Sequence, residues 1–279
     1  MNLISRRSLI ASAAALPLWA KRSNLRIGVT DWNLRQTGKV EAVALAKSLG
    51  FEGVEVSLGR DASGGKLPLD NSEIQEQYLS QSKTHGIALA GTCLDILHVN
   101  YLKNDKLGAR WVADGIPITR KLNAHVMLLP FFGKGALTNR PEMDYVADVL
   151  KELAPAAEKA GVLLGLENTI SAEDNVHIID RVGSKSLKVY YDVGNSTRAG
   201  FDVVKEIPWL GASRICQFHL KDNPNYLGQG KIPFPEVLHE IMDLGFNGFA
   251  NLETDSPSKS VENDMRTNLD FVRKLLKRA

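Results

Sequence analysis

The chain has 279 residues, enough for one large domain with a full hydrophobic core, and its formal net charge at pH 7 is +2. The 34 Lys and Arg nearly balance the 32 Asp and Glu, and no basic cluster follows the first residues, which argues against a nucleic-acid-binding surface. Two cysteines, Cys93 and Cys216, provide neither a disulfide framework nor a zinc knuckle. We expect both to be buried, and a single disulfide between them is the alternative.

The N-terminus has the features of an export signal. Arg6 and Arg7 precede an apolar stretch over residues 9–20, which is too short to span a bilayer comfortably. The segment SRRSL (5–9) resembles the start of a twin-arginine signal. We therefore expect a signal peptide over residues 1–22, a mature domain over 23–279 in the periplasm, and no stable membrane insertion after removal of the signal. A frayed amphipathic helix is the weaker alternative.

Eight short apolar segments recur along the rest of the chain, and each is bounded by residues that break regular structure. Segments of this kind are typical of buried parallel strands. They cover residues 25–32, 53–58, 87–94, 125–130, 162–168, 187–193, 214–220 and 249–254.

Amphipathic segments between these strands predict helices. Several end at a glycine, and the third begins with Pro141, both ordinary helix-boundary signals. The predicted helices cover residues 40–50, 73–86, 141–161, 234–245 and 261–278. Alternation at roughly thirty residues per unit predicts an α/β fold, a single-domain (β/α)8 TIM barrel. An open doubly wound sheet is the alternative, but the first strand lacks a glycine-rich phosphate-binding turn.

Four side chains that can bind a metal lie at the ends of the last four predicted strands. They are Glu167, Asp192, His219 and Glu253. In a barrel these strand ends meet at the carboxyl-terminal rim, where barrel active sites lie. Three carboxylates at one point would repel one another without a cation. Oxygen ligands with one imidazole suit Mn²⁺ best, with Mg²⁺, Co²⁺ or Zn²⁺ as alternatives.

The order Glu, Asp, His, Glu on strands five to eight resembles that of the xylose isomerase-like TIM barrels, the sugar phosphate isomerase/epimerase superfamily. Supporting segments are FEGVEVSL (51–58), residues 97–130 and GQGKIPF (228–234), and the resemblance covers about residues 25–277. It implies that Glu167, Asp192, His219 and Glu253 bind the metal. It also implies that Glu167 and Glu253 are the acid/base pair.

These residue types suit proton transfer next to a carbonyl group. A chelated substrate has an acidified α-carbon proton, and a carboxylate that removes it gives a metal-stabilised ene-diolate. We therefore predict an enzyme, a divalent-metal-dependent sugar isomerase or epimerase. The expected export argues against a phosphorylated metabolite and favours a non-phosphorylated sugar or keto-sugar. The alternative is a carbon–oxygen lyase, either a dehydratase or a keto-glycoside deglycosidase. An apurinic endonuclease-like phosphoester hydrolase and a non-catalytic sugar-binding module are less favoured.

The sequence departs from the ketose epimerases of this family at two positions. Asn195 stands where they carry a substrate-contacting histidine, and Asn225 where they carry an arginine, whereas Glu173 matches a carboxylate of their substrate pocket. Lys221, in HLKD (219–222), resembles the lysine of keto-inositol dehydratases. It either points into the site as a catalytic group or pairs at the rim with Asp222 or Asp255.

Three further residues are candidates around the pocket. Trp32 follows the first strand and suits stacking on a sugar face, and His98 follows the third and suits a hydroxyl group, although a structural role is slightly favoured for His98. We expect Glu55, inside the second strand, to bind a cationic group within the barrel rather than to line the pocket. The expected partners are a small carbohydrate and a second copy of the chain in a homo-oligomer; no nucleic acid is expected.

The export hypothesis has a direct test. Replacing both Arg6 and Arg7 by lysine should block export if the twin-arginine route is used. Immunoblots of the periplasmic and cytoplasmic fractions measure this, and an unchanged periplasmic yield would reject that route.

Overall fold

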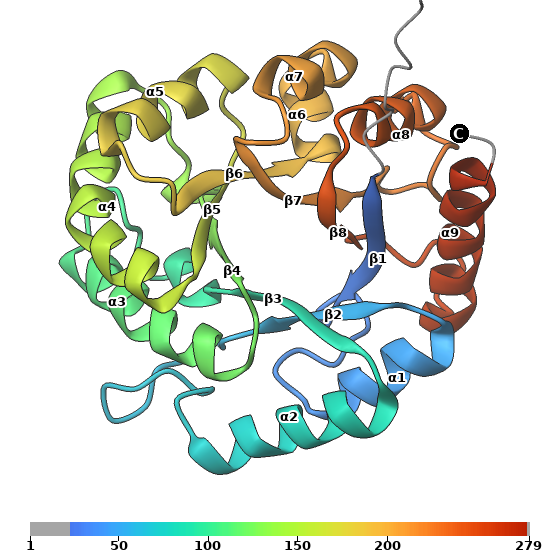
Figure 1. The fold of residues 1–279 in the computed structure, drawn as a ribbon, viewed down its shortest axis with the longest axis horizontal. Helices are drawn as coiled ribbons and strands as arrows, with labels where there is room; N and C mark the ends of the chain where they lie inside the picture. The colour runs from blue at the N-terminus through green and yellow to red at the C-terminus, as the bar shows by residue number, and fades with distance from the viewer. Residues whose placement is uncertain (1–22, 278–279) are drawn as a thin grey trace, which may run out of the picture.

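The computed structural model describes residues 23–277, so the expected signal peptide lies outside the described residues. Eight parallel strands close into a barrel in chain order, with helices around it (Figure 1). This confirms the predicted single-domain (β/α)8 TIM barrel. The strands are β1 (Asn24–Thr30), β2 (Gly53–Ser57), β3 (Ala88–Cys93), β4 (Val126–Pro130), β5 (Leu163–Glu167), β6 (Leu187–Asp192), β7 (Ile215–Leu220) and β8 (Asn247–Leu252).

The five predicted helices are present, with boundaries within two residues of those expected. They are α1 (Glu41–Leu49), α2 (Ser72–His85), α4 (Arg140–Ala160), α8 (Phe234–Asp243) and α9 (Val261–Leu276). Four helices had not been predicted one by one: α3 (Lys106–Lys121), α5 (Ala172–Val182), α6 (Val193–Ala199) and α7 (Val203–Leu210). Within residues 23–277, no helix combines the length and the apolar character needed to cross a membrane.

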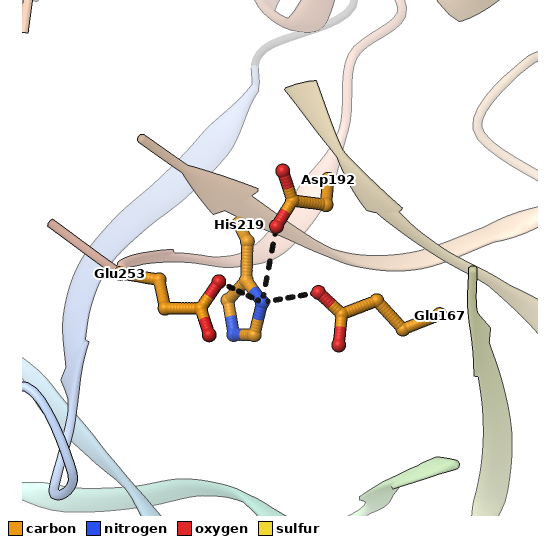
Figure 2. A group of neighbouring side chains, drawn as sticks. All are labelled: Glu167, Asp192, His219 and Glu253. Carbon is orange, nitrogen blue, oxygen red and sulfur yellow. Dashed lines mark hydrogen bonds and ion pairs between the residues drawn. The ribbon is translucent and has the colours of Figure 1, made fainter. Parts of the chain in front are cut away.

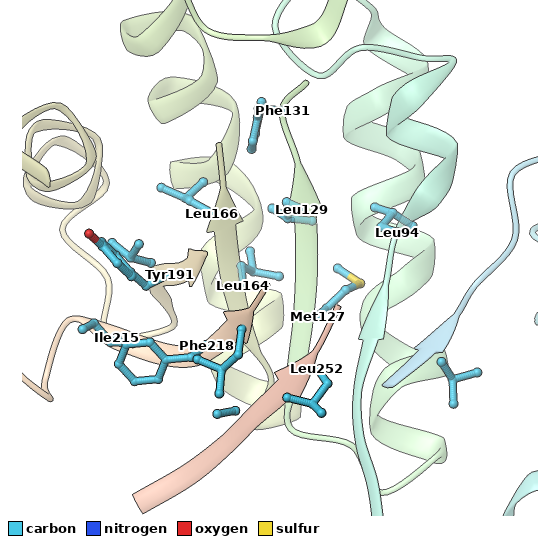
Figure 3. Packing of buried hydrophobic residues seen from close by; sticks show 14 of the residues in the cluster. Leu94, Met127, Leu129, Phe131, Leu164, Leu166, Tyr191, Ile215, Phe218 and Leu252 are labelled. Carbon is cyan, nitrogen blue, oxygen red and sulfur yellow. The ribbon is translucent and has the colours of Figure 1, made fainter. Parts of the chain in front are cut away.

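The apolar core lies mainly between the strands and the surrounding helices. Met127 and Leu129 of β4 and Leu164 and Leu166 of β5 pack in this layer (Figure 3). Side chains alternate along a strand, so Val126 and Leu128 point instead into the barrel, where they join a smaller cluster that contains both cysteines. Cys93 and Cys216 are buried free thiols, as expected, and no disulfide joins them.

Glycines on β1 and β3 leave room for polar side chains inside the barrel. A Cβ atom on Gly28 of β1 would lie 2.0 Å from Asn251 Oδ1, and one on Gly91 of β3 would lie 3.2 Å from Gln217 Oε1. The first distance is a severe clash with a fully buried side chain. The barrel therefore holds a polar layer directly below its carboxyl-terminal rim.

Asp31 fixes the loop that follows β1. Its Oδ2 accepts hydrogen bonds from the backbone N–H groups of Gly38 (2.9 Å) and Ser57 (3.1 Å). Its own N–H donates to Glu55 O (2.9 Å). The carboxyl is completely buried, and within residues 23–277 its Oδ1 has no hydrogen-bond partner. Burial raises the pKa of Asp31 from 3.8 to about 8, against the effect of the two N–H groups.

This raised pKa predicts a pH-dependent stability difference for Asp31→Asn. The native state holds a proton on Asp31 that the unfolded chain loses above about pH 4, so this contribution to stability is present at low pH and is lost as the pH rises towards about 8. Asn keeps the acceptor and cannot ionise. Relative to wild type, the variant should therefore gain stability between pH 5 and 8, by up to about 1.4 kcal/mol per pH unit. Urea unfolding of both proteins at several pH values measures this difference; a constant or opposite trend would show that Asp31 is ionised in the native state.

Candidate active site

Four side chains from the last four strands converge at the carboxyl-terminal rim, as Figure 2 shows. Glu167 and Asp192 end β5 and β6, His219 lies one residue before the end of β7, and Glu253 directly follows β8. One nitrogen or oxygen atom from each lies within 4.8 Å of the others. The structure therefore brings together all four predicted metal ligands.

Nδ1 of His219 is at the centre of the group. It lies 2.9 Å from Glu167 Oε1, 3.4 Å from Glu253 Oε2 and 3.7 Å from Asp192 Oδ2 (Figure 2). The histidine is completely buried, and Asp192 and Glu167 nearly so. Three carboxylates thus face one another in a region with little solvent, where charge interactions are strong.

Lys221 contributes a second positive charge to this group. Its Nζ lies 2.6 Å from Asp192 Oδ2 and 2.5 Å from Glu253 Oε2. The side chain passes over Gly194, where a Cβ atom would lie 2.5 Å from Lys221 Cγ. Lys221 therefore points into the site, and the alternative of a rim lysine paired with Asp222 or Asp255 is wrong.

Asp222 has a different structural role. Its carboxylate accepts hydrogen bonds from the backbone N–H groups of Gly228, Gly230 and Lys231. Asp222 therefore binds the glycine-containing loop before α8 instead of forming an ion pair with Lys221, its neighbour in the sequence.

Burial and charge act in opposite directions on the pKa values of this group. Burial lowers the pKa of His219 and Lys221, but the surrounding carboxylates outweigh it and raise both pKa values above their usual range. Burial raises the pKa of Glu253, yet His219 and Lys221 bring it down to about 2. For Asp192 burial prevails, and its pKa is raised to about 7 despite Lys221.

A fourth carboxylate contacts His219 from below. Glu55 Oε2 lies 2.9 Å from His219 Nε2 and accepts hydrogen bonds from Tyr190 (2.7 Å) and Asn251 (3.2 Å). Glu55 is completely buried, which agrees with the prediction of a partner inside the barrel. Sequence reasoning missed Tyr190, Gln217 and Asn251. They lie two residues before the predicted ligands Asp192, His219 and Glu253, so alternation directs them to the same inward side.

The four-residue group opens into a cavity of about 620 Å³. Trp32, His98, Asn195, Glu167, Lys221 and Glu253 are among its lining residues. Trp32 Nε1 donates to Glu253 Oε1 (3.0 Å), and Asn195 Nδ2 donates to Glu167 Oε1 (3.4 Å). A cavity of this size and polarity suits a small polar ligand.

Comparison with known proteins identifies the fold family. The sequence model of the family described as xylose isomerase-like TIM barrel matches residues 43–275. The chain belongs to this family. The resemblance inferred from the strand-end residues is therefore correct.

Curated relatives within reach of sequence comparison include two epimerases. The 2-epi-5-epi-valiolone 7-phosphate 2-epimerase of Actinoplanes sp. is 25% identical over 204 residues, covering 71% of this chain and 73% of the relative. The fructoselysine 3-epimerase of Shigella flexneri is 24% identical over 238 residues, covering 75% and 82%. The solved structure of D-psicose 3-epimerase from Clostridium cellulolyticum H10 with D-tagatose superposes with a TM-score of 0.74 at 18% identity, covering 90% of this chain and 99% of that one. This last similarity shows the shared fold.

Two positions compared with the family pattern, the predicted pocket residue Glu173 and the departure Asn225, lie away from the cavity. Glu173 is exposed in the first turn of α5 and does not line the cavity, so the arrangement gives no support to its predicted substrate contact. Asn225 is also exposed, and its amide donates to the backbone of Asp222 (3.3 Å). The departure from the family arginine therefore leaves no side chain directed into the site from this position.

Five polar lining residues were missed in the sequence analysis: Thr37, Ser57, Arg60, Asp95 and Arg198. Ser57 hydrogen-bonds to Asp95, and both lie with Arg60 on the β2–β3 side of the cavity, whereas Arg198 lies at the end of α6. Burial raises the pKa of Asp95. Ser57 and Asp95 stand at the ends of strands as the four predicted ligands do, which is the signal that could have found them.

The convergence on His219 predicts the effect of removing it. His219→Ala should abolish tight binding of one divalent ion, because it removes the only nitrogen donor and leaves the carboxylates facing one another. Elemental analysis after dialysis measures the metal content. His125→Ala is the matched control, because His125 is exposed and lies at the opposite end of the barrel, just before β4. Full metal content in the His219 variant would refute this site.

Proposed function

We propose that this protein is a divalent-metal-dependent sugar epimerase or isomerase that moves a proton at a carbon next to a carbonyl group. The observation that carries the proposal is the convergence of Glu167, Asp192, His219 and Glu253 at the base of the cavity. Two of the four, Glu167 and Glu253, line that cavity and so can meet a substrate as well as a metal.

The donor set suits a divalent ion. Three carboxylate oxygens and one imidazole nitrogen lie within 4.8 Å of one another, which matches the preferences of Mn²⁺, Mg²⁺ or Co²⁺ and is tolerated by Zn²⁺. When bound, such an ion would polarise the substrate carbonyl and acidify the neighbouring C–H group. Mn²⁺ remains our first choice, because imidazole joins an otherwise oxygen-based set.

Glu167 is the better placed of the two carboxylates for removing the proton. Its contacts with His219 and Asn195 both use Oε1, so among the residues that the structure describes Oε2 has no hydrogen-bond donor. Both oxygens of Glu253 are engaged, Oε1 with Trp32 and Oε2 with Lys221. Glu167 therefore suits proton removal, and Glu253 suits holding and orienting the substrate until its contacts loosen.

The relatives support epimerisation over isomerisation. Both relatives described above are named as epimerases, one acting at carbon 2 and the other at carbon 3. Their names share a sugar-like substrate but differ in the position of the reaction. We therefore propose a polyhydroxylated substrate with a carbonyl group and leave its stereochemistry to a substrate screen. The expected export favours a non-phosphorylated sugar or keto-sugar, whereas the Actinoplanes relative is named for a phosphate, so the screen includes both.

Lys221 supports a lyase as the second candidate. Its ammonium lies in the cavity wall against Glu253, where it could stabilise an enolate and assist departure of a β-substituent. The raised pKa of Lys221 makes it a fixed positive charge rather than a proton donor, which places the epimerase first.

Phosphoester hydrolysis by a histidine-rich metal cluster is disfavoured. Besides His219, the chain has five histidines, His85, His98, His125, His177 and His239. Only His98 among them lines the cavity, and it stacks on Phe132.

The proposed proton transfer predicts the effect of two substitutions. Glu167→Gln and Glu253→Gln should each lower turnover by roughly a hundredfold or more, because Gln keeps the shape but has no basic oxygen. With an active keto-sugar in D₂O, deuterium should enter the α-carbon in wild type, and NMR should show no incorporation in at least one variant. Metal content should fall less than in His219→Ala.

The same assay separates the candidate functions. Deuterium exchange without release of water or an aglycone supports the epimerase, and release of either supports the lyase. Wild-type exchange rates in both Gln variants would rule out proton removal by these carboxylates.

A further inference from the structure

Glu55 is a buried carboxylate below the four-residue group, and it lies outside the predicted ligand set. We propose that Glu55 is a positioning residue that holds His219 with Nδ1 directed at the carboxylates, and that it thereby sets the affinity of the site for its metal. This inference rests on the proposed function, since it concerns the metal that the proposed reaction uses.

The two nitrogens of His219 have separate partners. Nδ1 faces Glu167, Asp192 and Glu253, and Nε2 faces Glu55 at 2.9 Å. Both nitrogens face carboxylate oxygens at 2.9 Å, so without a metal both can carry N–H groups. When a metal binds among Glu167, Asp192 and Glu253, Nδ1 would give up its proton and become the ligand, whereas Nε2 would keep its N–H group towards Glu55. A carboxylate behind a metal-binding histidine fixes its tautomer and orientation and increases its basicity.

Glu55 is itself held in one position. Its Oε2 accepts from Tyr190 and Asn251 as well as from His219, and Asn251 also donates to Tyr190 Oη (2.7 Å) and Gln217 Oε1 (2.9 Å). The space for Asn251 exists because β1 carries Gly28 at the facing position. The acceptor oxygen therefore has little freedom to move away from Nε2.

The charge of Glu55 has no other evident use in this network. A neutral glutamine oxygen could also accept from Tyr190 and Asn251, although more weakly than a carboxylate. A fourth carboxylate close to three others adds repulsion and a desolvation cost, and within residues 23–277 its buried Oε1 has no hydrogen-bond partner. Of the three donors to Oε2, the imidazole is the one that can carry a positive charge, so the negative charge strengthens this contact most, which points to a role exerted through His219.

Glu55→Gln is the test, because it preserves shape and removes the charge. Competition with a chromogenic chelator should show Mn²⁺ or Zn²⁺ binding about 10- to 100-fold weaker than in wild type, the usual effect of losing such a partner. Glu52→Gln is the matched control. It makes the same chemical change at an exposed carboxylate just before β2, at the amino-terminal end of the barrel and away from the four ligands. Its metal affinity should stay within about threefold of wild type.

A measurement on the wild-type protein keeps the proposal testable even if Glu55→Gln fails to fold. In zinc-loaded protein with ¹⁵N-labelled histidine, long-range ¹H–¹⁵N correlations should show His219 protonated at Nε2 and metal-bound at Nδ1, with assignment by His219→Ala. In Glu55→Gln that tautomer should be less well defined. Metal binding through Nε2 in wild type, or wild-type affinity in Glu55→Gln, would overturn the inference and leave the proposed function standing. A wild-type protein that binds no divalent ion would overturn both.

Discussion

The mutual repulsion of three carboxylates in a buried space is the constraint on which the rest of the site depends. Glu167, Asp192 and Glu253 approach one nitrogen of His219 where little water reaches them. Close like charges in such a place are costly unless positive charge compensates them. His219 and Lys221 supply that charge within the chain, and the neighbouring structure serves to keep both in place. Gly194 leaves room for the lysine, and Glu55 supports the histidine.

The barrel makes this arrangement achievable because alternation along each strand stacks the interior in layers. Tyr190, Gln217 and Asn251 lie two residues before Asp192, His219 and Glu253, so the layer below the site comes from the same strands as the site. Asn251 fits because Gly28 is its partner on the neighbouring strand β1, and Gln217 fits because β3 carries Gly91. Rigid supporting contacts of this kind are what hold catalytic groups in a productive geometry.

Much of the fold and of the four-residue group could be predicted from the sequence because both follow from short-range patterns. Apolar runs predicted the strands, and one acidic or imidazole group at each of four consecutive strand ends predicted the residues that converge. Helix α3 was not predicted because Gly108, Gly115 and Pro117 interrupt its pattern. A Cβ atom at Gly115 would lie 2.7 Å from Met127 Sδ, so a glycine is needed here to make room for a tertiary contact. No local sequence pattern reveals such a contact. The ion pairs of Lys221 and the exposed position of Glu173 likewise depend on how loops turn after the strands, which spacing alone does not determine.

The two oxygens of each carboxylate in the site have different surroundings. Asp192 uses Oδ1 to accept from the N–H of Asn195 and begin α6, while its Oδ2 faces Lys221 and His219. Oε1 of Glu253 accepts a hydrogen bond from Trp32, and its Oε2 accepts one from Lys221. Glu167 differs, because His219 and Asn195 share Oε1 and, within residues 23–277, no donor binds Oε2. Three residues of similar chemistry thus have different partners, and under the proposed function this asymmetry between Glu167 and Glu253 would give the two faces of a substrate unequal bases.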